Sequence, residues 1–298
     1  MRYITIIMLL LLSGCGGGSH QPEPVTNPYV DRVQTLHASG VAMLQRERWT
    51  AAEKTFGRAL VAAQLADDSA LIARSWYNLG VIRAARGNRQ KAEEAFMQAM
   101  AIAERHGHRV TYMRARFGLA MSRSRAGEEA WMPSALDGKW PADVHLAAAR
   151  LAQYQGRTDV AGEEYRRAAE RSNRKTRAGL TYRAQAHMGL AMLAHAAGND
   201  EVARKETEQV LQLCRQVGAP RLAAHALLLF SELNGDMAAR RDSLERALSI
   251  YRALKDDRGQ RESLEALIAL ARNAGEDEQS ARWQQQLGRL AAPGTGGP

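Results

Sequence analysis

Turn signals recur along this chain at a spacing of about 40 residues, and each one stands between two runs of helical periodicity. Most of them are glycines, which readily take the left-handed conformation that ends a helix. The predicted turns are at Arg48, Gly87, Gly127, Gly156, Gly198, Gly235 and Gly275. A repeat of this length is typical of an array of helical hairpins in which each hairpin packs on its neighbours.

The second unit shows the pattern most clearly. Its residues are Trp76-Tyr77-Asn78-Leu79-Gly80 in the first helix, Gly87-Asn88 in the turn, and Ala92, Phe96 and Ala99 in the second helix. Because Gly80 and Ala92 are small, the two helices can approach closely, and Phe96 is predicted to fill the space between successive hairpins. The whole unit resembles the tetratricopeptide repeat.

The resemblance extends over residues 29–291, in part in units one, four and five and weakly in units six and seven. In unit three, Pro133, Gly138 and Pro141 cut short the predicted second helix. The family resemblance implies an all-α fold, a right-handed superhelical solenoid of about seven antiparallel hairpins with a concave groove. The 45% of apolar residues and the abundance of good helix formers agree with this fold class.

The N-terminal residues resemble the signal of a bacterial lipoprotein. An apolar run, too short to span a bilayer, ends in Leu12-Ser13-Gly14-Cys15. The resemblance to a lipobox implies that residues 1–14 are removed and that Cys15 is acylated, which would anchor the protein in a membrane. Because Gly16 stands where inner-membrane lipoproteins carry Asp, the resemblance implies the periplasmic face of the outer membrane.

Two further segments flank the predicted repeats. Residues 15–28 comprise the Cys and a Gly- and Pro-rich stretch that is predicted to be a flexible tether. Residues 292–298 are predicted to be a disordered tail. A tether between anchor and repeats would let the repeats reach a partner away from the membrane.

In the tetratricopeptide repeat family, the groove is lined by particular positions of the first helix of each unit. The resemblance implies that the partner-binding residues here are Arg74, Tyr77, Val81, Arg114, Phe117, Met121, Arg125, Arg150, Tyr154, Gln185, Met188 and His195. Gln34, His37, Val41, Gln153 and Met192 occupy equivalent positions. Arg, aromatic and Met side chains often supply anchor contacts in protein interfaces. The alternative is that the aromatic residues only pack the helices and the Arg residues only solvate the groove.

The chain has a formal net charge of +9, and its basic residues are nearly all Arg. This charge favours an acidic partner, or it reflects an Arg-rich composition spread over solvated helix faces. The densest basic stretch is Arg171, Arg174, Lys175, Arg177 and Arg183, which is either a site for an acidic partner or envelope polymer, or a solvated loop.

The sequence contains no phosphate-binding Gly-rich loop, no nucleophile elbow and no zinc-protease motif. His106 and His108 lack further ligands nearby in the sequence, and Cys214 lies in an apolar helical run. We therefore expect no catalysis, no cofactor and no metal, and an exported protein is not expected to meet nucleic acid. The function predicted is a scaffold that binds a protein or peptide in the cell envelope, for example as a pilotin or as an adaptor for peptidoglycan hydrolases. The alternative is a lipoprotein that binds peptidoglycan or another glycan, and the oligomeric state stays open.

Overall fold

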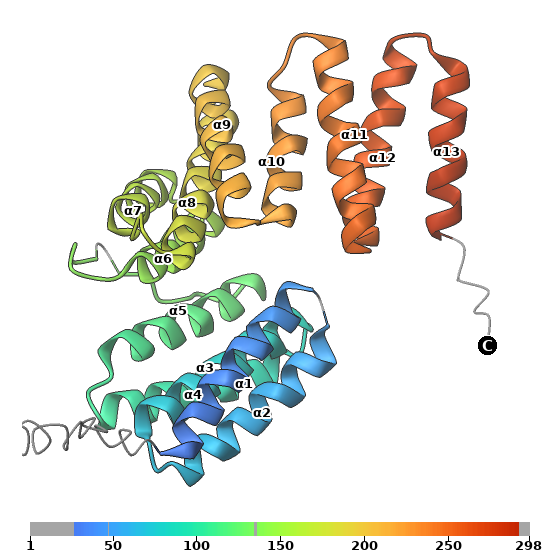
Figure 1. The fold of residues 1–298 in the computed structure, drawn as a ribbon. Helices are drawn as coiled ribbons and strands as arrows, with labels where there is room; N and C mark the ends of the chain where they lie inside the picture. Colours follow the sequence, from blue (N-terminus) through green and yellow to red (C-terminus); the bar gives the residue numbers. More distant parts are fainter. Residues whose placement is uncertain (1–26, 47, 134–135, 292–298) are drawn as a thin grey trace, which may run out of the picture.

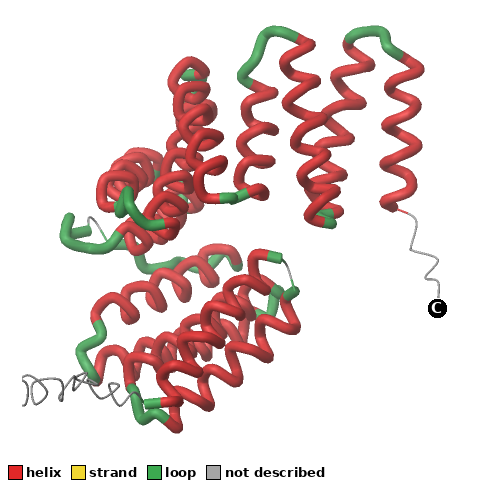
Figure 2. The backbone as a smooth tube through the Cα atoms, in the orientation of Figure 1, coloured by secondary structure: helices red, strands yellow, loops and turns green. Residues whose placement is uncertain are grey.

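The computed structural model describes residues 27–46, 48–133 and 136–291, and in these ranges it contains thirteen α-helices and no strand (Figures 1 and 2). The helices are α1 (Pro28–Gln45), α2 (Trp49–Leu65), α3 (Ser69–Ala85), α4 (Arg89–Arg105), α5 (Arg109–Arg125), α6 (Ala142–Tyr154), α7 (Thr158–Arg171), α8 (Arg177–Ala196), α9 (Asp200–Val217), α10 (Pro220–Glu232), α11 (Met237–Leu254), α12 (Asp257–Asn273) and α13 (Asp277–Ala291). The predicted all-α fold class is confirmed. The predicted signal segment with Cys15, nearly all of the tether and the tail lie outside the described residues.

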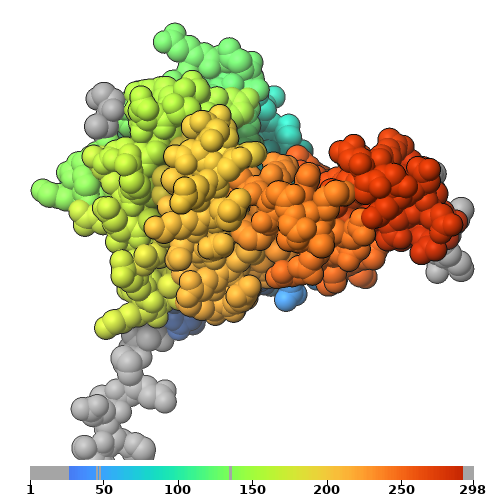
Figure 3. Space-filling view, turned by 90° about the horizontal axis from the view of Figure 1, so that it is seen from above, coloured from blue at the N-terminus to red at the C-terminus, as the bar shows by residue number. Residues whose placement is uncertain are grey.

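Consecutive helices pack as antiparallel pairs, and each pair packs on the next (Figure 1). Six pairs are complete: α1 with α2, α3 with α4, α6 with α7, α8 with α9, α10 with α11, and α12 with α13. The path of the array turns in the region of α5 to α8, so that the later units extend as an arm from the broader first part (Figures 1 and 3). The chain is thus a solenoid in which each unit contacts its sequence neighbours.

The turns inside the hairpins form largely where the glycines predict them. Five of the six predicted glycines have φ angles between 72° and 75°, in the left-handed region that glycine adopts without strain; they are Gly87, Gly127, Gly156, Gly198 and Gly275. Gly235 has no positive φ, so the turn between α10 and α11 forms in another way. There, the side chain of Asp236 accepts hydrogen bonds from the first backbone amides of α11.

Glycines inside the helices serve a different purpose, because they make room for aromatic rings. A Cβ atom on Gly80 would lie 2.5 Å from the ring of Phe96, and one on Gly118 in the next unit would lie 2.6 Å from the same ring. The ring of Phe96 therefore lies against glycines of two successive first helices, so it fills the space between successive hairpins as predicted. Gly80 faces this ring, and not Ala92 as the pattern of small residues had predicted. Gly40 with Phe56, Gly189 with Tyr165 and Gly259 with Tyr251 repeat the arrangement.

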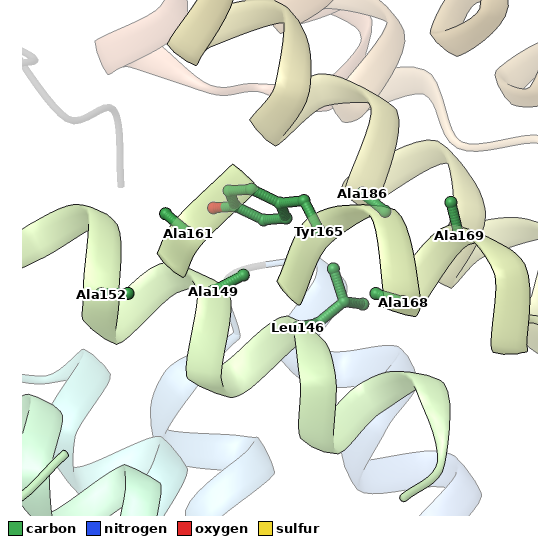
Figure 4. Close-up of a cluster of buried hydrophobic side chains, with 8 residues drawn as sticks. All are labelled: Leu146, Ala149, Ala152, Ala161, Tyr165, Ala168, Ala169 and Ala186. Atoms are coloured by element: carbon green, nitrogen blue, oxygen red, sulfur yellow. The ribbon is translucent and has the colours of Figure 1, made fainter. Parts of the chain in front are cut away.

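Figure 4 shows the same principle in the hairpin of α6 and α7. The ring of Tyr165 lies among the small side chains of Ala149, Ala161 and Ala186, and all four residues are buried. Alanine allows close approach of helices at no cost in side-chain entropy, so the core of this hairpin combines one large ring with several methyl groups.

The third unit lacks its second helix. In the described part of the segment from residue 126 to 141 there is no helix, and α5 is followed by a loop. Trp131, Met132, Leu136 and Trp140 from this loop pack against α5 and α6, and they cover the apolar face that a second helix would otherwise cover. Arg167 of α7 donates a hydrogen bond from Nη1 to the carbonyl oxygen of Leu136 at 2.8 Å, which fixes the loop.

Candidate partner-binding surface

Four successive first helices, α3, α5, α6 and α8, bring a set of Arg and Tyr side chains together. We call it the Arg–Tyr cluster, and it consists of Arg74 and Tyr77 from α3, Arg114 from α5, Asp143 and Arg150 from α6, and Tyr182 and Gln185 from α8. Two direct contacts join these helices. Arg114 donates a hydrogen bond from Nε to the carboxylate of Asp143, and Arg150 donates one from Nη2 to Oε1 of Gln185 at 3.1 Å.

The inner faces of α3, α5, α6 and α8 lie side by side around Tyr77. Burial raises the pKa of this phenol; the charges of Arg114 and Arg150 oppose the rise, and that of Asp143 adds to it. Tyr182 lies on α8, which is separated from α3 in the array by both α5 and α6. α3 contacts α5, α5 contacts α6 and α6 contacts α8, so the inner faces of these four helices adjoin along the array.

The cluster has an excess of positive charge, because it contains three guanidinium groups and one carboxylate, and only Arg114 pairs with that carboxylate. Burial alone would lower the pKa of Arg114, but the hydrogen bond to Asp143 raises it, so this guanidinium stays charged. Arg74 and Arg150 are exposed, and within the described part of the chain neither forms an ion pair. Burial also raises the pKa of Tyr182, which keeps its hydroxyl protonated and able to donate. The cluster is therefore suited to groups that carry negative charge.

Five of the twelve predicted groove residues lie in the Arg–Tyr cluster: Arg74, Tyr77, Arg114, Arg150 and Gln185. The other seven do not. Val81, Met121 and Met188 are half-buried and pack against core clusters, as the rings of Tyr77 and Tyr182 also do. Arg125, Tyr154 and His195 lie at or near the C-terminal ends of their helices. The last of these seven residues, Phe117, is buried.

For Phe117 the prediction of a partner contact is wrong. Its side chain is 2% exposed, and its ring lies 5.5 Å from the ring of Trp131, which belongs to the loop of unit three. His37, at an equivalent position in unit one, is buried as well, with Nε2 2.9 Å from Oγ of Ser75. Burial lowers the pKa of this histidine to about 4. Both side chains hold helices together and are not available to a partner.

Of the other equivalent positions, Gln34, Val41 and Met192 are exposed. Gln153 accepts a hydrogen bond from the hydroxyl of Tyr165 at 2.7 Å. His195 is engaged by carboxylates at the start of α9 and the end of α10: Nδ1 lies 2.8 Å from Asp200 and Nε2 lies 3.3 Å from Glu232. The Asp200 contact raises its pKa.

Asp143 and Tyr182 are the two cluster residues that the sequence pattern did not identify. Asp143 follows directly on the loop of unit three, where the repeat loses its register. Tyr182 precedes Gln185 by three residues, just as Arg74 precedes Tyr77, so both pairs place two polar side chains on one helix face. This spacing was the available signal for Tyr182.

The basic stretch between units four and five divides into two parts. Arg171, Arg174 and Lys175 are exposed around the turn between α7 and α8. Arg177 donates a hydrogen bond from Nε to the carbonyl oxygen of Val217 at 2.9 Å, and Arg183 lies 3.5 Å from His187. Arg177 therefore joins the start of α8 to the end of α9 although it is exposed, and the contact of Arg183 lies within α8.

Groups with possible chemistry have structural partners in the described residues. The rings of His106 and His108 stack 6.2 Å apart, and His108 bonds to Oγ of Ser69 at 2.8 Å. Cys214 is 3% exposed, and burial raises the pKa of its thiol to about 11, so the thiol is protonated near neutral pH. The described residues contain no cluster of three or more potential metal ligands. In the same ranges, every helix is too short or too polar to cross a bilayer.

Comparison with known proteins agrees with this architecture. Residues 31–105 match the family model of the tetratricopeptide repeat. Comparison with curated protein sequences finds no match. Among solved structures, the apo form of the quorum sensor NprR from B. thuringiensis is similar with a TM-score of 0.60 and 13% identity, over 88% of this chain and 77% of that one.

Two further structures are similar over most of the chain. The Rap conjugation gene regulator of the plasmid pLS20, in complex with the Phr* peptide, has a TM-score of 0.52 and 13% identity over 90% of this chain and 66% of that one. BtubC from P. vanneervenii has a TM-score of 0.50 and 16% identity over 92% and 95%. At these identities the likeness shows the fold. The described chain is therefore an α-helical solenoid, and its residues 31–105 match the tetratricopeptide repeat family.

Proposed function

We propose that this protein is a non-catalytic scaffold that binds a protein or peptide through the Arg–Tyr cluster while a lipid on Cys15 holds it at the outer membrane. The observation that carries the binding role is the convergence of Arg74, Tyr77, Arg150 and Tyr182 from three different helices. The one carboxylate of the cluster, Asp143, already pairs with Arg114, so the exposed guanidinium groups of Arg74 and Arg150 have no carboxylate partner within the cluster. The excess charge is available to a ligand.

The chemistry of the cluster favours a partner segment that carries Asp or Glu side chains. A guanidinium group offers a planar fork of donors that matches a carboxylate, and a protonated phenol adds a further donor beside an apolar ring. Asp143 holds Arg114 in position, and Gln185 holds Arg150. Because these side chains are already oriented, binding an acidic segment costs less conformational entropy than it would on a mobile surface.

The similar structures support a peptide or protein as the ligand. The Rap regulator of pLS20 was solved with its Phr* peptide, and another similar structure is a Rap protein complexed with competence and sporulation factor. Those partners belong to those proteins. Both proteins support the proposal because they are similarly folded solenoids that bind such partners.

We expect the double substitution Arg74→Ala, Arg150→Ala to abolish capture of the partner. The test is chemical cross-linking in the cells that produce the protein, followed by purification of the full-length chain and identification of what is bound to it. Removing two exposed guanidinium groups from an interface centre should weaken binding by at least about 2 kcal/mol, roughly thirtyfold. The thermal stability should stay nearly unchanged, because both side chains are exposed.

The matched control is Arg58→Ala, Arg105→Ala, which removes two exposed Arg residues from the second helices α2 and α4. It produces the same change in net charge and should leave capture intact. If both double variants lose the partner equally, total charge and not the Arg–Tyr cluster is responsible. If neither loses it, binding occurs elsewhere on the chain.

The location is a separate proposal, which rests on the sequence of residues 1–16. We expect Cys15→Ser to release the protein from the membrane fraction, because a serine side chain is not a substrate for thioether-linked lipidation. Fractionation of cells producing the wild type and the variant measures this directly, and density separation of inner and outer membranes tests the role of Gly16. Persistent membrane association of the variant would contradict a lipid anchor at this residue.

A further inference from the structure

A pocket opens at the ends of α5 and α6, next to the loop that replaces the second helix of unit three. Its volume is about 830 Å³, within the range of small-molecule sites. Its lining residues are Ser124, Gly127, Glu128, Glu129, Ala130, Trp131, Met132, Tyr154, Gln155 and Arg157. The pocket depends on the missing helix, since the loop supplies Glu128 to Met132 in its place.

Neighbouring residues hold several of the lining side chains in position. The amide nitrogen of Gln155 donates to Oγ of Ser124 at 3.2 Å and to the carbonyl oxygen of Ala130 at 3.3 Å, which leaves its amide oxygen as an acceptor. Arg89 of α4 pairs with the carboxylate of Glu128. The guanidinium of Arg116 lies 3.5 Å from the centre of the Trp131 ring. A pocket with ordered walls binds a ligand without first having to order them.

The exposed part of the lining combines an aromatic ring with planar polar groups. Tyr154 is 53% exposed although it is a large aromatic residue, and within the described part of the chain its hydroxyl has no hydrogen-bond partner. The carboxylate of Glu129, the amide of Gln155 and the guanidinium of Arg157 add acceptors and donors around it. This surface differs in kind from the Arg–Tyr cluster, where positive charge is in excess.

We propose that this pocket binds a neutral saccharide. Charge disfavours ionic ligands, because Glu128 already pairs with Arg89 and the lining then offers one further carboxylate, Glu129, and one guanidinium group, Arg157. The many polar groups disfavour a lipid or another fully apolar ligand. A sugar ring presents an apolar C–H face that stacks on an aromatic ring and a rim of hydroxyl groups that donate and accept hydrogen bonds, which is what Tyr154 and its polar neighbours offer.

The saccharide site goes beyond the proposed scaffold function and uses different residues. Tyr154 lies four residues after Arg150, on the same face of α6 and one helical turn further along. A bound saccharide would therefore lie beside a partner on the Arg–Tyr cluster without competing for its guanidinium groups. Loss of saccharide binding and loss of partner binding can be told apart, because the substitutions that remove one site leave the residues of the other site unchanged.

The experiment titrates the full-length protein with two neutral probes, chitotetraose and maltotetraose, and follows binding by calorimetry and by tryptophan fluorescence. We expect at least one probe to bind and to change the fluorescence of Trp131. In Tyr154→Ala the affinity should fall about tenfold, since stacking on an aromatic ring contributes about 1 kcal/mol or more. Gln155→Ala should weaken binding through loss of the amide acceptor.

The matched control is Tyr29→Ala, which removes another exposed tyrosine, on α1 and outside the pocket. It should bind the probes like the wild type, and Tyr29→Ala and Tyr154→Ala should keep the wild-type melting temperature, whereas Gln155→Ala also loses the bonds to Ser124 and Ala130. The proposal is overturned if neither probe binds at millimolar concentration, or if Tyr154→Ala and Gln155→Ala bind as tightly as the wild type. It is also overturned if Tyr154→Ala weakens the binding of an acidic peptide but does not weaken the binding of either saccharide.

Discussion

Replacing Gly80 by Leu should lower the free energy of unfolding by about 3 kcal/mol, because the new side chain has no space. Even its Cβ atom would lie 2.5 Å from the ring of Phe96, and that ring is bounded on its other side by Gly118 of the next unit. Phe96 is 2% exposed and cannot swing into solvent without leaving the core. Chemical denaturation followed by circular dichroism measures the loss, and hydrogen exchange should locate it in α3, α4 and α5.

Gly57→Leu is the matched control. Gly57 lies within α2 in the preceding hairpin, and a Cβ atom there would meet no atom within 4 Å. Leucine favours a helix over glycine by roughly 1 kcal/mol, so this substitution should leave the stability unchanged or raise it. Equal destabilisation by the two substitutions, or none by Gly80→Leu, would show that the close approach of glycine and ring is not what holds these units together.

Replacing Glu164 by Ala should cost about 3 kcal/mol, because it breaks a buried pair from one side. Glu164 on α7 is 2% exposed and His145 on α6 is fully buried, with Nδ1 of the imidazole 2.6 Å from Oε2 of the carboxylate. Arg167 donates from Nη1 to the other carboxylate oxygen at 3.1 Å. Without the carboxylate, the imidazole stays buried with no acceptor for its N–H, and the loop that Arg167 fixes loses part of its support.

The neighbouring residue provides the comparison. Glu163 also pairs with Arg167, at 3.0 Å, and with Arg166 at 3.2 Å, but its side chain is 48% exposed. Because exposed ion pairs contribute little, Glu163→Ala should cost less than about 1 kcal/mol. Glu164→Gln keeps an acceptor for the imidazole and should recover part of the loss. A Glu164→Ala protein as stable as Glu163→Ala would refute the structural role of the buried pair.

Much of the fold was predictable because a repeat places the same requirement on every unit. The glycines at the turns and the place of Phe96 between successive hairpins depend on residues close in sequence or one unit apart, so their pattern is visible along the chain. In the third unit, the packing of the loop could not be predicted in this way. The prolines predict an interrupted helix, but they do not reveal that Trp131 and Leu136 fold back to cover α5.

The binding surface was predictable only in part, because a repeat position does not show what packs against its side chain. Family positions identify which side chains leave a first helix on its inner face, and five of them do meet in the Arg–Tyr cluster. Whether such a side chain stays accessible depends on what packs against it. Phe117 is buried by Trp131, a residue of the irregular loop that no repeat position describes.

The sequence by itself determined the helices, most of their turns and the small residues at which they meet, because helical periodicity, glycine conformation and side-chain size act over short distances along the chain. Only the tertiary structure decided which side chains converge. Arg114 and Asp143 are 29 positions apart, and Arg150 and Gln185 are 35 positions apart; each pair meets because successive inner helices pack together. The pocket beside Tyr154 exists because a loop occupies the place of a helix. Exposure and electrostatic coupling are properties of contacts between distant segments, and such contacts form only when the units stack.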